Sequence, residues 1–284
     1  MKISLLLLPG ILALGSFLCW ADNDGPKPNN IVPAQPQDKD RAFETTPDWS
    51  DEFDYSGLPD PAKWGYDIGG SGWGNNELEY YSNDFKNAGV ANGLLTISAI
   101  KEEINGMHYS SARLVTKNKF DFLYGRIEVK AKVPAGKGTW PAIWMLPTVR
   151  KYGLWPKSGE IDIMEHVGYD PDVIHISTHC EAYYWRLNNQ KTAVKKIENA
   201  ITAFHLYRID WTPNTIRGYI DDNLVFTNVN EGTGYQVWPF DQQFHLLLNV
   251  AVGGDWGGIQ GIDEAAFPAS MQVDYVRYYK MIDK

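Results

Sequence analysis

The sequence predicts an all-β protein, a sandwich of two curved antiparallel sheets. Short segments that are β-branched, aromatic or alternating follow one another, and glycine or proline turns separate them. No repeat period emerges, and many short strands of this kind are typical of a sandwich or a barrel. In a sandwich of curved sheets, one concave face is available for a long ligand. The expected strands are 94–100, 111–116, 124–133, 141–146, 172–179, 205–211, 216–221, 244–252 and 271–279. Only 187–203 offers a passable helix.

Residues 1–21 predict an export signal. Lys2 supplies the positive charge, and ISLLLLPGILALGSFL is an apolar run too short and too early for a convincing membrane span. Two processing routes fit the stretch Cys19-Trp20-Ala21: lipidation of Cys19, as in a bacterial lipoprotein, or cleavage after Ala21. We therefore expect either a cell-surface lipoprotein anchored to a membrane through Cys19 or a secreted or periplasmic protein.

Proline-rich sequence follows the signal. Residues 22–40 hold four prolines and almost no apolar side chains, which predicts a disordered spacer over 22–42 and a folded domain over 43–284. The chain has only two cysteines, Cys19 and Cys180. If Cys19 is removed or acylated, no disulfide can form, so the domain has to rely on a sizeable core, which this length can supply.

Composition limits the ligand. The formal net charge is −9 and the sequence pI is about 5.2, which argues against nucleic acid as a partner and favours a neutral ligand. Aromatic residues make up 13% of the chain. A tryptophan-rich core would explain about half of them, and flat rings lining a ligand groove would explain the rest.

The stretch GEIDIMEH (159–166) carries three acids, Glu160, Asp162 and Glu165, with unequal gaps. In a regular strand, Glu160 and Asp162 share a face and Glu165 points the other way. If Met164 is the extra residue of a β-bulge, the alternation resets and all three acids share one face. The isoleucines between them then point into the core.

Three acids on one face suit glycoside hydrolysis better than a structural role. The alternative, a solvated edge strand, lacks any Lys or Arg within the motif to balance the charge. Hydrolysis of a glycosidic bond needs one carboxyl group to protonate the leaving oxygen and another, ionised, on the other side of the anomeric carbon. The middle Asp162 could orient a neighbouring Glu and keep the other protonated by repulsion.

These motifs resemble glycoside hydrolase family 16, in particular its laminarinase-like (endo-β-1,3-glucanase) branch. The family pattern E-x-D-x-x-E is matched at Glu160, Asp162 and Glu165, and the similarity extends over nearly all of 48–280. The resemblance implies a jelly-roll sandwich and retaining endo-hydrolysis of a β-glucan. It assigns Glu160 as nucleophile, Glu165 as general acid/base and Asp162 as the assisting residue. The matching blocks are WSDEFD (49–54), GWGNNELEYY (72–81), WPAIWMLP (140–147), GEIDIMEHVG (159–168), FHLYRIDWTP (204–213) and FHLLLNVAVGGDWGG (244–258).

A glucan chain presents apolar faces edged by hydroxyls, so its cleft needs aromatic rings and orienting polar groups. Trp140 and Trp144 lie four residues apart, on one face of a straight strand, where they could flank the cleaved bond or fill the core. Arg113 within an apolar strand also needs an explanation. The further residues that resemble cleft positions of the family are Trp73, Asn75, Glu77, Arg113, His179 and Trp256.

Several smaller questions stay open in the sequence. His175 and His179 share a strand face, but no third ligand is evident nearby, which disfavours zinc. His179 resembles a family residue near the cleaved bond, and a structural histidine fits equally well, while the role of Trp155 is undecided. No cofactor is expected for catalysis. The family often carries a structural calcium ion, whose expected ligands are Glu52, the Gly93 carbonyl and Asp274.

The expected activity is endo-hydrolysis of β-1,3-glucan such as laminarin, of mixed-linkage β-1,3-1,4-glucan, or of both, by a monomer. The inserted Met164 favours this branch over strict lichenases, whose motif resembles E-x-D-x-E. A hydrolase of a marine galactan, similar to an agarase, shares the motif and is the first alternative. A non-catalytic glucan-binding module is the second, although all three acids are present.

Overall fold

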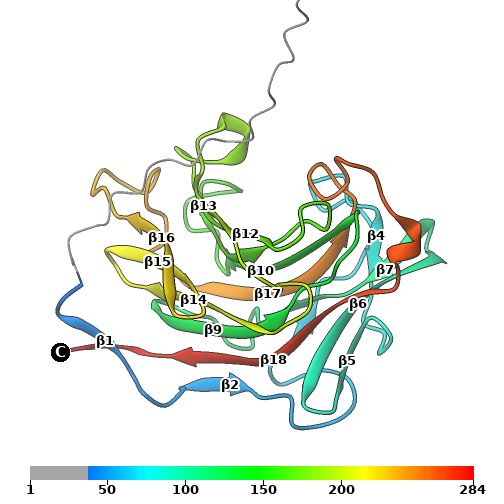
Figure 1. The fold of residues 1–284 in the computed structure, drawn as a ribbon. Helices are drawn as coiled ribbons and strands as arrows, with labels where there is room; N and C mark the ends of the chain where they lie inside the picture. Colours follow the sequence, from blue (N-terminus) through cyan, green and yellow to red (C-terminus); the bar gives the residue numbers. More distant parts are fainter. Residues whose placement is uncertain (1–37) are drawn as a thin grey trace, which may run out of the picture.

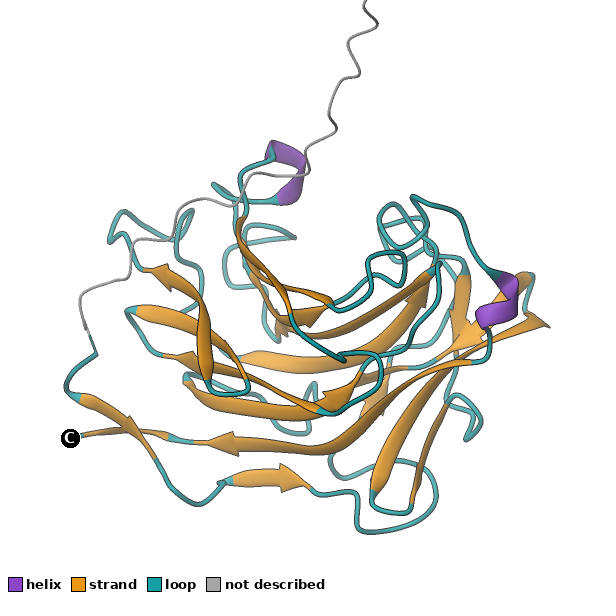
Figure 2. Cartoon of the chain, in the orientation of Figure 1, coloured by secondary structure: helices purple, strands orange, loops and turns teal. Residues whose placement is uncertain are grey.

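The computed structural model describes residues 38–284 and shows a β-sandwich (Figures 1 and 2). Its strands form a seven-stranded sheet, a ten-stranded sheet and a small two-stranded sheet. Helical structure in this range is limited to two short 3-10 turns, η1 (Trp185–Leu187) and η2 (Glu264–Ala266). None of the described helical segments is long and apolar enough to cross a bilayer. The expected all-β sandwich is confirmed.

The seven-stranded sheet has the order β13-β12-β11-β10-β17-β8-β3, and every neighbouring pair in it is antiparallel. The sheet curves so that its outer face is hollow (Figure 1). Its strands are β3 (Gly65–Tyr66), β8 (Arg113–Val115), β10 (Thr139–Pro147), β11 (Glu160–Glu165), β12 (Val173–His179), β13 (Lys191–Lys196) and β17 (Phe244–Val252).

The ten-stranded sheet lies beneath it, with the main order β16-β15-β14-β9-β18-β6-β7-β4. One pair, β4 with β7, is parallel, which departs from the fully antiparallel expectation. The strands of this sheet are β2 (Trp49–Asp51), β4 (Glu79–Tyr81), β5 (Ala88–Ala91), β6 (Leu94–Ile104), β7 (Met107–Ser111), β9 (Gly125–Lys132), β14 (His205–Trp211), β15 (Thr215–Ile220), β16 (Asn223–Val229) and β18 (Ala269–Tyr279).

The hydrophobic core fills the space between the two sheets. Alternate side chains of each strand enter it, such as Ile161 and Ile163 from β11 and Val129 from β9, and all three are fully buried. Burying one such aliphatic side chain stabilises the fold by roughly 1.5–3 kcal/mol. Cys180 is buried in the same core as a free thiol, so the described part of the chain is held by packing, without a disulfide.

The helix expected within 187–203 is wrong. Lys191–Lys196 form β13, the edge strand of the seven-stranded sheet, and pair with β12 over six residues. The backbone hydrogen bonds offered by β12 outweigh the weak helical pattern, and the β-branched Thr192 and Val194 suit a strand. Exposed lysines along this edge also oppose pairing with another chain.

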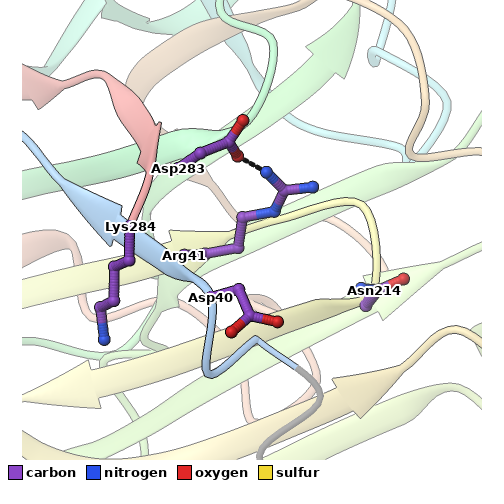
Figure 3. Close-up of a pocket in the computed structure, with 5 residues that line it drawn as sticks. All are labelled: Asp40, Arg41, Asn214, Asp283 and Lys284. Atoms are coloured by element: carbon purple, nitrogen blue, oxygen red, sulfur yellow. Dashed lines mark ion pairs between the residues drawn. The ribbon is translucent and has the colours of Figure 1, made fainter.

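The folded domain begins earlier than residue 43. Arg41–Phe43 form β1, which pairs with β19 (Met281–Asp283) in the two-stranded sheet. Figure 3 shows the ion pair between Arg41 and Asp283 there. Residues 38–42, which were expected to belong to the spacer, are therefore part of the described fold. A polar pocket beside this sheet is lined by Asp40, Arg41, Asn214, Asp283 and Lys284.

Asp38 fixes this terminal segment to the turn between β14 and β15. Its side chain is only 6% exposed and accepts hydrogen bonds from Thr212 Oγ1 at 2.9 Å, from Arg217 Nη1 at 2.9 Å and from Thr215 Oγ1. A buried carboxylate with this many donors holds the chain in one place. The expected signal peptide, the lipidated Cys19 and most of the spacer lie outside the described residues.

We expect Asp38→Ala to lower the free energy of unfolding by about 1–3 kcal/mol, because it leaves the Arg217 guanidinium and two hydroxyls without their acceptor. Urea denaturation measures this change. Asp40→Ala is the control, since the Asp40 side chain is exposed and only its backbone oxygen accepts a bond, from Lys284 N. Equal stability of both variants would show that Asp38 does not anchor the segment.

Candidate active site

A β-bulge in β11 sets the geometry of the site. On the β10 side, Trp144 pairs with Asp162 and Ile143 with Met164, so Ile163 has no residue opposite it. On the β12 side, the register also shifts by one residue between Asp162 and Glu165. The predicted bulge is confirmed, but the residue skipped by the β10 register is Ile163 and not the predicted Met164.

The bulge turns all three acids to one face. Ile161, Ile163 and Met164 are fully buried in the core between the sheets. Paired residues of neighbouring strands share a face, and Glu165 and Asp162 pair with Ala142 and Trp144 of β10. Because Trp140, Ala142 and Trp144 alternate along β10, they point to the same face as the acids. This is the concave outer face of the sheet.

The register aligns a row of side chains across that face. Arg113 of β8 pairs with Asn249 of β17, which pairs with Ala142 of β10. Ala142 then pairs with Glu165, and Glu165 with His175 of β12. Residues far apart in the sequence therefore stand side by side because of strand order alone.

Glu160 is held from two sides. Trp155, in the loop between β10 and β11, donates its indole N–H to Glu160 Oε2 at 2.9 Å. His179, the partner of Glu160 on β12, places Nε2 3.9 Å from Glu160 Oε1 and 3.3 Å from Asp162 Oδ2. Tyr184 packs edge-on against the Trp155 ring, with 5.6 Å between the ring centroids. An indole and an imidazole thus hold the first of the three acids.

Glu165 has a matching arrangement. Trp140 donates its indole N–H to Glu165 Oε1 at 3.1 Å, and the Trp256 ring meets the Trp140 ring edge-on at 5.5 Å. The His175 ring also meets Trp256, at 4.8 Å. Gly257 allows this loop to approach, because a Cβ there would lie 2.8 Å from the Trp140 Cβ. A side chain at that position would push Trp256 away from Trp140.

Arg113 lies between two indole rings. Its guanidinium carbon is 4.8 Å from the ring centroid of Trp73 and 4.8 Å from that of Trp144. Asp67 Oδ2 lies 3.1 Å from Arg113 Nε. The buried arginine is thus explained by stacking on two tryptophans and by one carboxylate. Both tryptophans are kept at fixed angles beside the acids.

A hydrogen-bonded chain connects the loop around Asn75 to the sheet. Asn75 donates to Glu77 at 3.1 Å, and the Tyr81 hydroxyl donates to the same carboxylate at 3.0 Å. Asn249 donates to the Tyr81 oxygen at 3.0 Å and accepts from the Trp144 indole at 2.7 Å. Glu77 is buried, so it orients this chain, while Asn75 is the more accessible of the two.

Burial raises the pKa values of all three acids, and repulsion from Asp162 adds to the effect for the two glutamates. Burial raises the pKa of Glu165 to about 8, and the neighbouring Asp162 carboxylate adds to the effect. The pKa of Glu160 is raised to about 8 by the same two causes in the same order, and the pKa of Asp162 is raised to about 8 by burial. The cluster therefore retains protons at neutral pH. The arrangement can supply both a proton donor and a carboxylate on one face.

The structure brings all eight expected ligand-contacting residues around the three acids or into the network that supports them. Trp155, left undecided by the sequence, contacts Glu160 directly. His175, which the sequence offered only as half of a zinc pair, packs on Trp256 instead. Sequence reasoning missed four other residues: Tyr81, Asn249, Asp67 and Tyr184. For Asn249, a lone Asn within the apolar run FHLLLNVAV was a usable signal.

The family model for glycosyl hydrolases family 16 matches residues 75–277 of this chain. The chain belongs to glycoside hydrolase family 16. This match covers the three acids, the strands that carry them and seven of the eight surrounding residues. Only Trp73 lies before its first residue.

Relatives agree with this family. The chain is 53% identical over 243 residues to a beta-glucanase of Rhodothermus marinus, a match that covers 83% of this chain and 85% of that protein. The crystal structure of the laminarinase from Rhodothermus marinus superposes with a TM-score of 0.84 and 51% identity, over 86% of this chain and 99% of the other. A mutant of SCLam, a non-specific endo-β-1,3(4)-glucanase with 1,3-β-D-cellobiosyl-glucose at its active site, gives a TM-score of 0.81 and 41% identity, over 89% and 99%. The jelly-roll sandwich is therefore confirmed.

The three expected calcium ligands lie on β18 or next to strands that pair with it, since Glu52 follows β2 and Gly93 precedes β6. Gly93 is in the turn before β6, whose Leu95 pairs with Val273, and Asp274 follows as the extra residue of a bulge in β18. However, Arg277 holds both oxygens of Glu52, at 2.9 and 2.8 Å, so that carboxylate is already occupied. Asp274 pairs with Lys130 at 2.8 Å, and an ion would have to displace the lysine. Calcium binding here stays a prediction.

If calcium binds, a chelator should lower the melting temperature, since an ion that binds only the folded state stabilises it. At saturating calcium we expect a loss on the order of 5 °C. Scanning calorimetry with and without EDTA measures it, and Asp274→Ala should abolish the calcium effect. A melting temperature that changes neither when calcium is added nor when EDTA is added would rule out a stabilising calcium ion.

The raised pKa of Glu165 has a consequence for stability. The unfolded chain loses this proton near pH 4.5 and the folded protein near pH 8, so the stabilising contribution is present at low pH and is lost as the pH rises through 8. Glu165→Gln removes the titration and still accepts the Trp140 bond. We expect the variant to gain on the order of 1–3 kcal/mol relative to wild type between pH 5 and pH 9.

Urea denaturation across this pH range measures the difference. Glu103→Gln is the control, because the side chain of Glu103 is 76% exposed. A stability difference between Glu165→Gln and wild type that stays constant with pH would contradict the raised pKa.

Proposed function

We propose that this chain cleaves internal linkages of a β-glucan, either β-1,3-glucan such as laminarin or mixed-linkage β-1,3-1,4-glucan or both, with retention of configuration. One observation carries the proposal: the bulge in β11 places Glu160, Asp162 and Glu165 on the concave face, where two indole N–H groups hold the outer acids. The names of the similar proteins, a beta-glucanase and a laminarinase, support the substrate class.

The reaction uses the two outer acids in turn. Glu165 donates its proton to the glycosidic oxygen while the Glu160 carboxylate attacks the anomeric carbon, which breaks the glycosidic bond and forms a glycosyl ester. Glu165, now ionised, takes a proton from water, and the resulting hydroxide displaces Glu160 at the anomeric carbon. A sugar hydroxyl in place of that water would give transglycosylation. Two inversions at one carbon retain its configuration.

The contacts of Glu160 and Glu165 differ in one respect that fits these separate roles. His179 lies 3.9 Å from Glu160, and its positive charge, when present, favours ionised Glu160. Glu165 has no cationic group within ion-pair distance among the described residues, whereas the Asp162 carboxylate favours the protonated forms of both glutamates. We therefore keep the roles that the family resemblance implies: Glu160 as the nucleophile, Glu165 as the general acid/base and Asp162 as the assisting residue, whose charge raises the pKa of both glutamates.

The surrounding rings suit a neutral polymer. Trp140, Trp144 and Trp256 present indole edges and faces beside the acids, and sugar rings stack on such surfaces through their apolar C–H faces. Arg113 is enclosed between Trp73 and Trp144 and paired with Asp67, so it is poorly placed to bind sulfate. This arrangement favours a glucan over a sulfated galactan.

We also propose that the protein acts outside the cytoplasm as a monomer. The support is the signal-like sequence of residues 1–21, with either a lipid anchor on Cys19 or cleavage after Ala21. Mass analysis of the mature N-terminus separates the two routes.

Hydrolysis of laminarin, lichenan, barley glucan and agarose, run side by side, tests the proposal. We expect oligosaccharides of several sizes from at least one glucan and none from agarose. Glu160→Gln should abolish turnover because it removes the nucleophile. Glu165→Gln should reduce the rate by about 10²–10⁴-fold because it removes the proton donor.

Glu103→Gln, an exposed substitution, is the activity control. Products from agarose alone would indicate the galactan hydrolase instead. Binding of glucan without hydrolysis by the wild type would indicate a binding module.

A further inference from the structure

Three side chains at the start of β11 and the end of β12 converge on one point. Glu160, Asp162 and His179 each offer one ligand atom, and the three atoms lie within 4.8 Å of one another. A set of three ligands, which the sequence did not show for a zinc site, is therefore present. It consists of His179 and the two acids, in place of the pair His175 and His179. His175 packs on Trp256 and does not take part.

One of the ligand–ligand distances matches a tetrahedral metal ion, and a second is close to it. Zinc bonds to nitrogen and oxygen of about 2.0–2.2 Å give a tetrahedral edge of about 3.3–3.6 Å. His179 Nε2 lies 3.3 Å from Asp162 Oδ2, which matches that edge, and 3.9 Å from Glu160 Oε1, which needs a small movement of the Glu160 side chain. Two carboxylates and one imidazole leave the fourth position for water.

Asp162 supplies a second, independent observation. It is 2% exposed, and its Oδ2 atom has no hydrogen-bond partner among the described residues, although it points at His179. Burying a carboxylate oxygen without a hydrogen-bond donor costs free energy, and a bound cation would offset that cost. Among the described residues, these three side chains form the one group of His, Cys, Asp or Glu that brings three ligand atoms this close together.

The contacts around these ligands also favour a metal ion. Trp155 bonds to Glu160 Oε2 and so leaves Oε1 free on the side of His179. Such an outer hydrogen bond orients a ligating carboxylate. His179 Nδ1 has no partner among the described residues, so its ring lacks the usual outer contact. This predicts reversible binding.

We propose that Glu160, Asp162 and His179 form a binding site for zinc or a similar divalent transition-metal ion, which masks the acid cluster when no sugar is bound. The ion occupies the carboxylate that the proposed function assigns as nucleophile, so metal and glucan exclude each other. Magnesium, which prefers six oxygen ligands, binds poorly there.

Titration calorimetry of the mature protein with zinc chloride, without any sugar, tests the site independently of the proposed activity. We expect one zinc ion per chain, and an affinity reduced by about 10-fold or more in Asp162→Asn, Glu160→Gln and His179→Asn, each of which removes one ligand. Glu165→Gln is the matched control: it is an acid on the same face, outside the ligand set, and should bind zinc like wild type.

His108→Gln controls for a surface site, since the His108 side chain is 75% exposed and lies 2.5 Å from the Glu103 carboxylate. Circular dichroism verifies that each variant is folded. If His179→Asn does not fold, Asp162→Asn and Glu160→Gln decide the question. No zinc binding by wild type, affinity unchanged in the folded ligand variants, or loss of binding only in His108→Gln would each overturn the proposal.

Discussion

One extra residue in β11 is the constraint on which the site depends. Without it, Glu165 would enter the core between the sheets, where an ionised carboxylate has no partner. With it, the chain buries Ile163 and Met164 together and turns Glu165 to the concave face. The neighbouring strands accept the insertion because the register of β10 and of β12 shifts at the same place.

Three ionised acids brought together in this way would repel one another, and hydrogen bonds from the surrounding residues offset only part of that repulsion. The indoles of Trp155 and Trp140 stabilise the ionised forms of Glu160 and Glu165, while burial and Asp162 stabilise the protonated forms. The balance leaves protons on the cluster at neutral pH. A site that donates a proton from one acid and attacks with the carboxylate of another needs this balance. The burial that lowers the free energy of unfolding at high pH therefore also supports hydrolysis of the glycosidic bond.

The sequence was sufficient for the fold class and for the acids, because both depend on local periodicity. Alternation identified the strands, and the broken alternation in GEIDIMEH identified the bulge. Relations between distant strands were less accessible: the pairing of Arg113 with Asn249, and the ring of Trp256 on Trp140, depend on strand order. The helix expected within 187–203 failed for the same reason, because the pairing of β13 with β12 overrides a weak local preference.

The most direct measurement of the account is the accessibility of single cysteines in β11. In a Cys19→Ser background, Cys180 is buried, and burial raises its pKa to about 11, so it should not react with a small thiol reagent. Glu165→Cys should react, and a glucan oligosaccharide should protect it, whereas Met164→Cys should stay unreactive in the core. Reaction at position 164 and none at position 165 would show that the strand has no bulge and that the proposed general acid does not face the substrate.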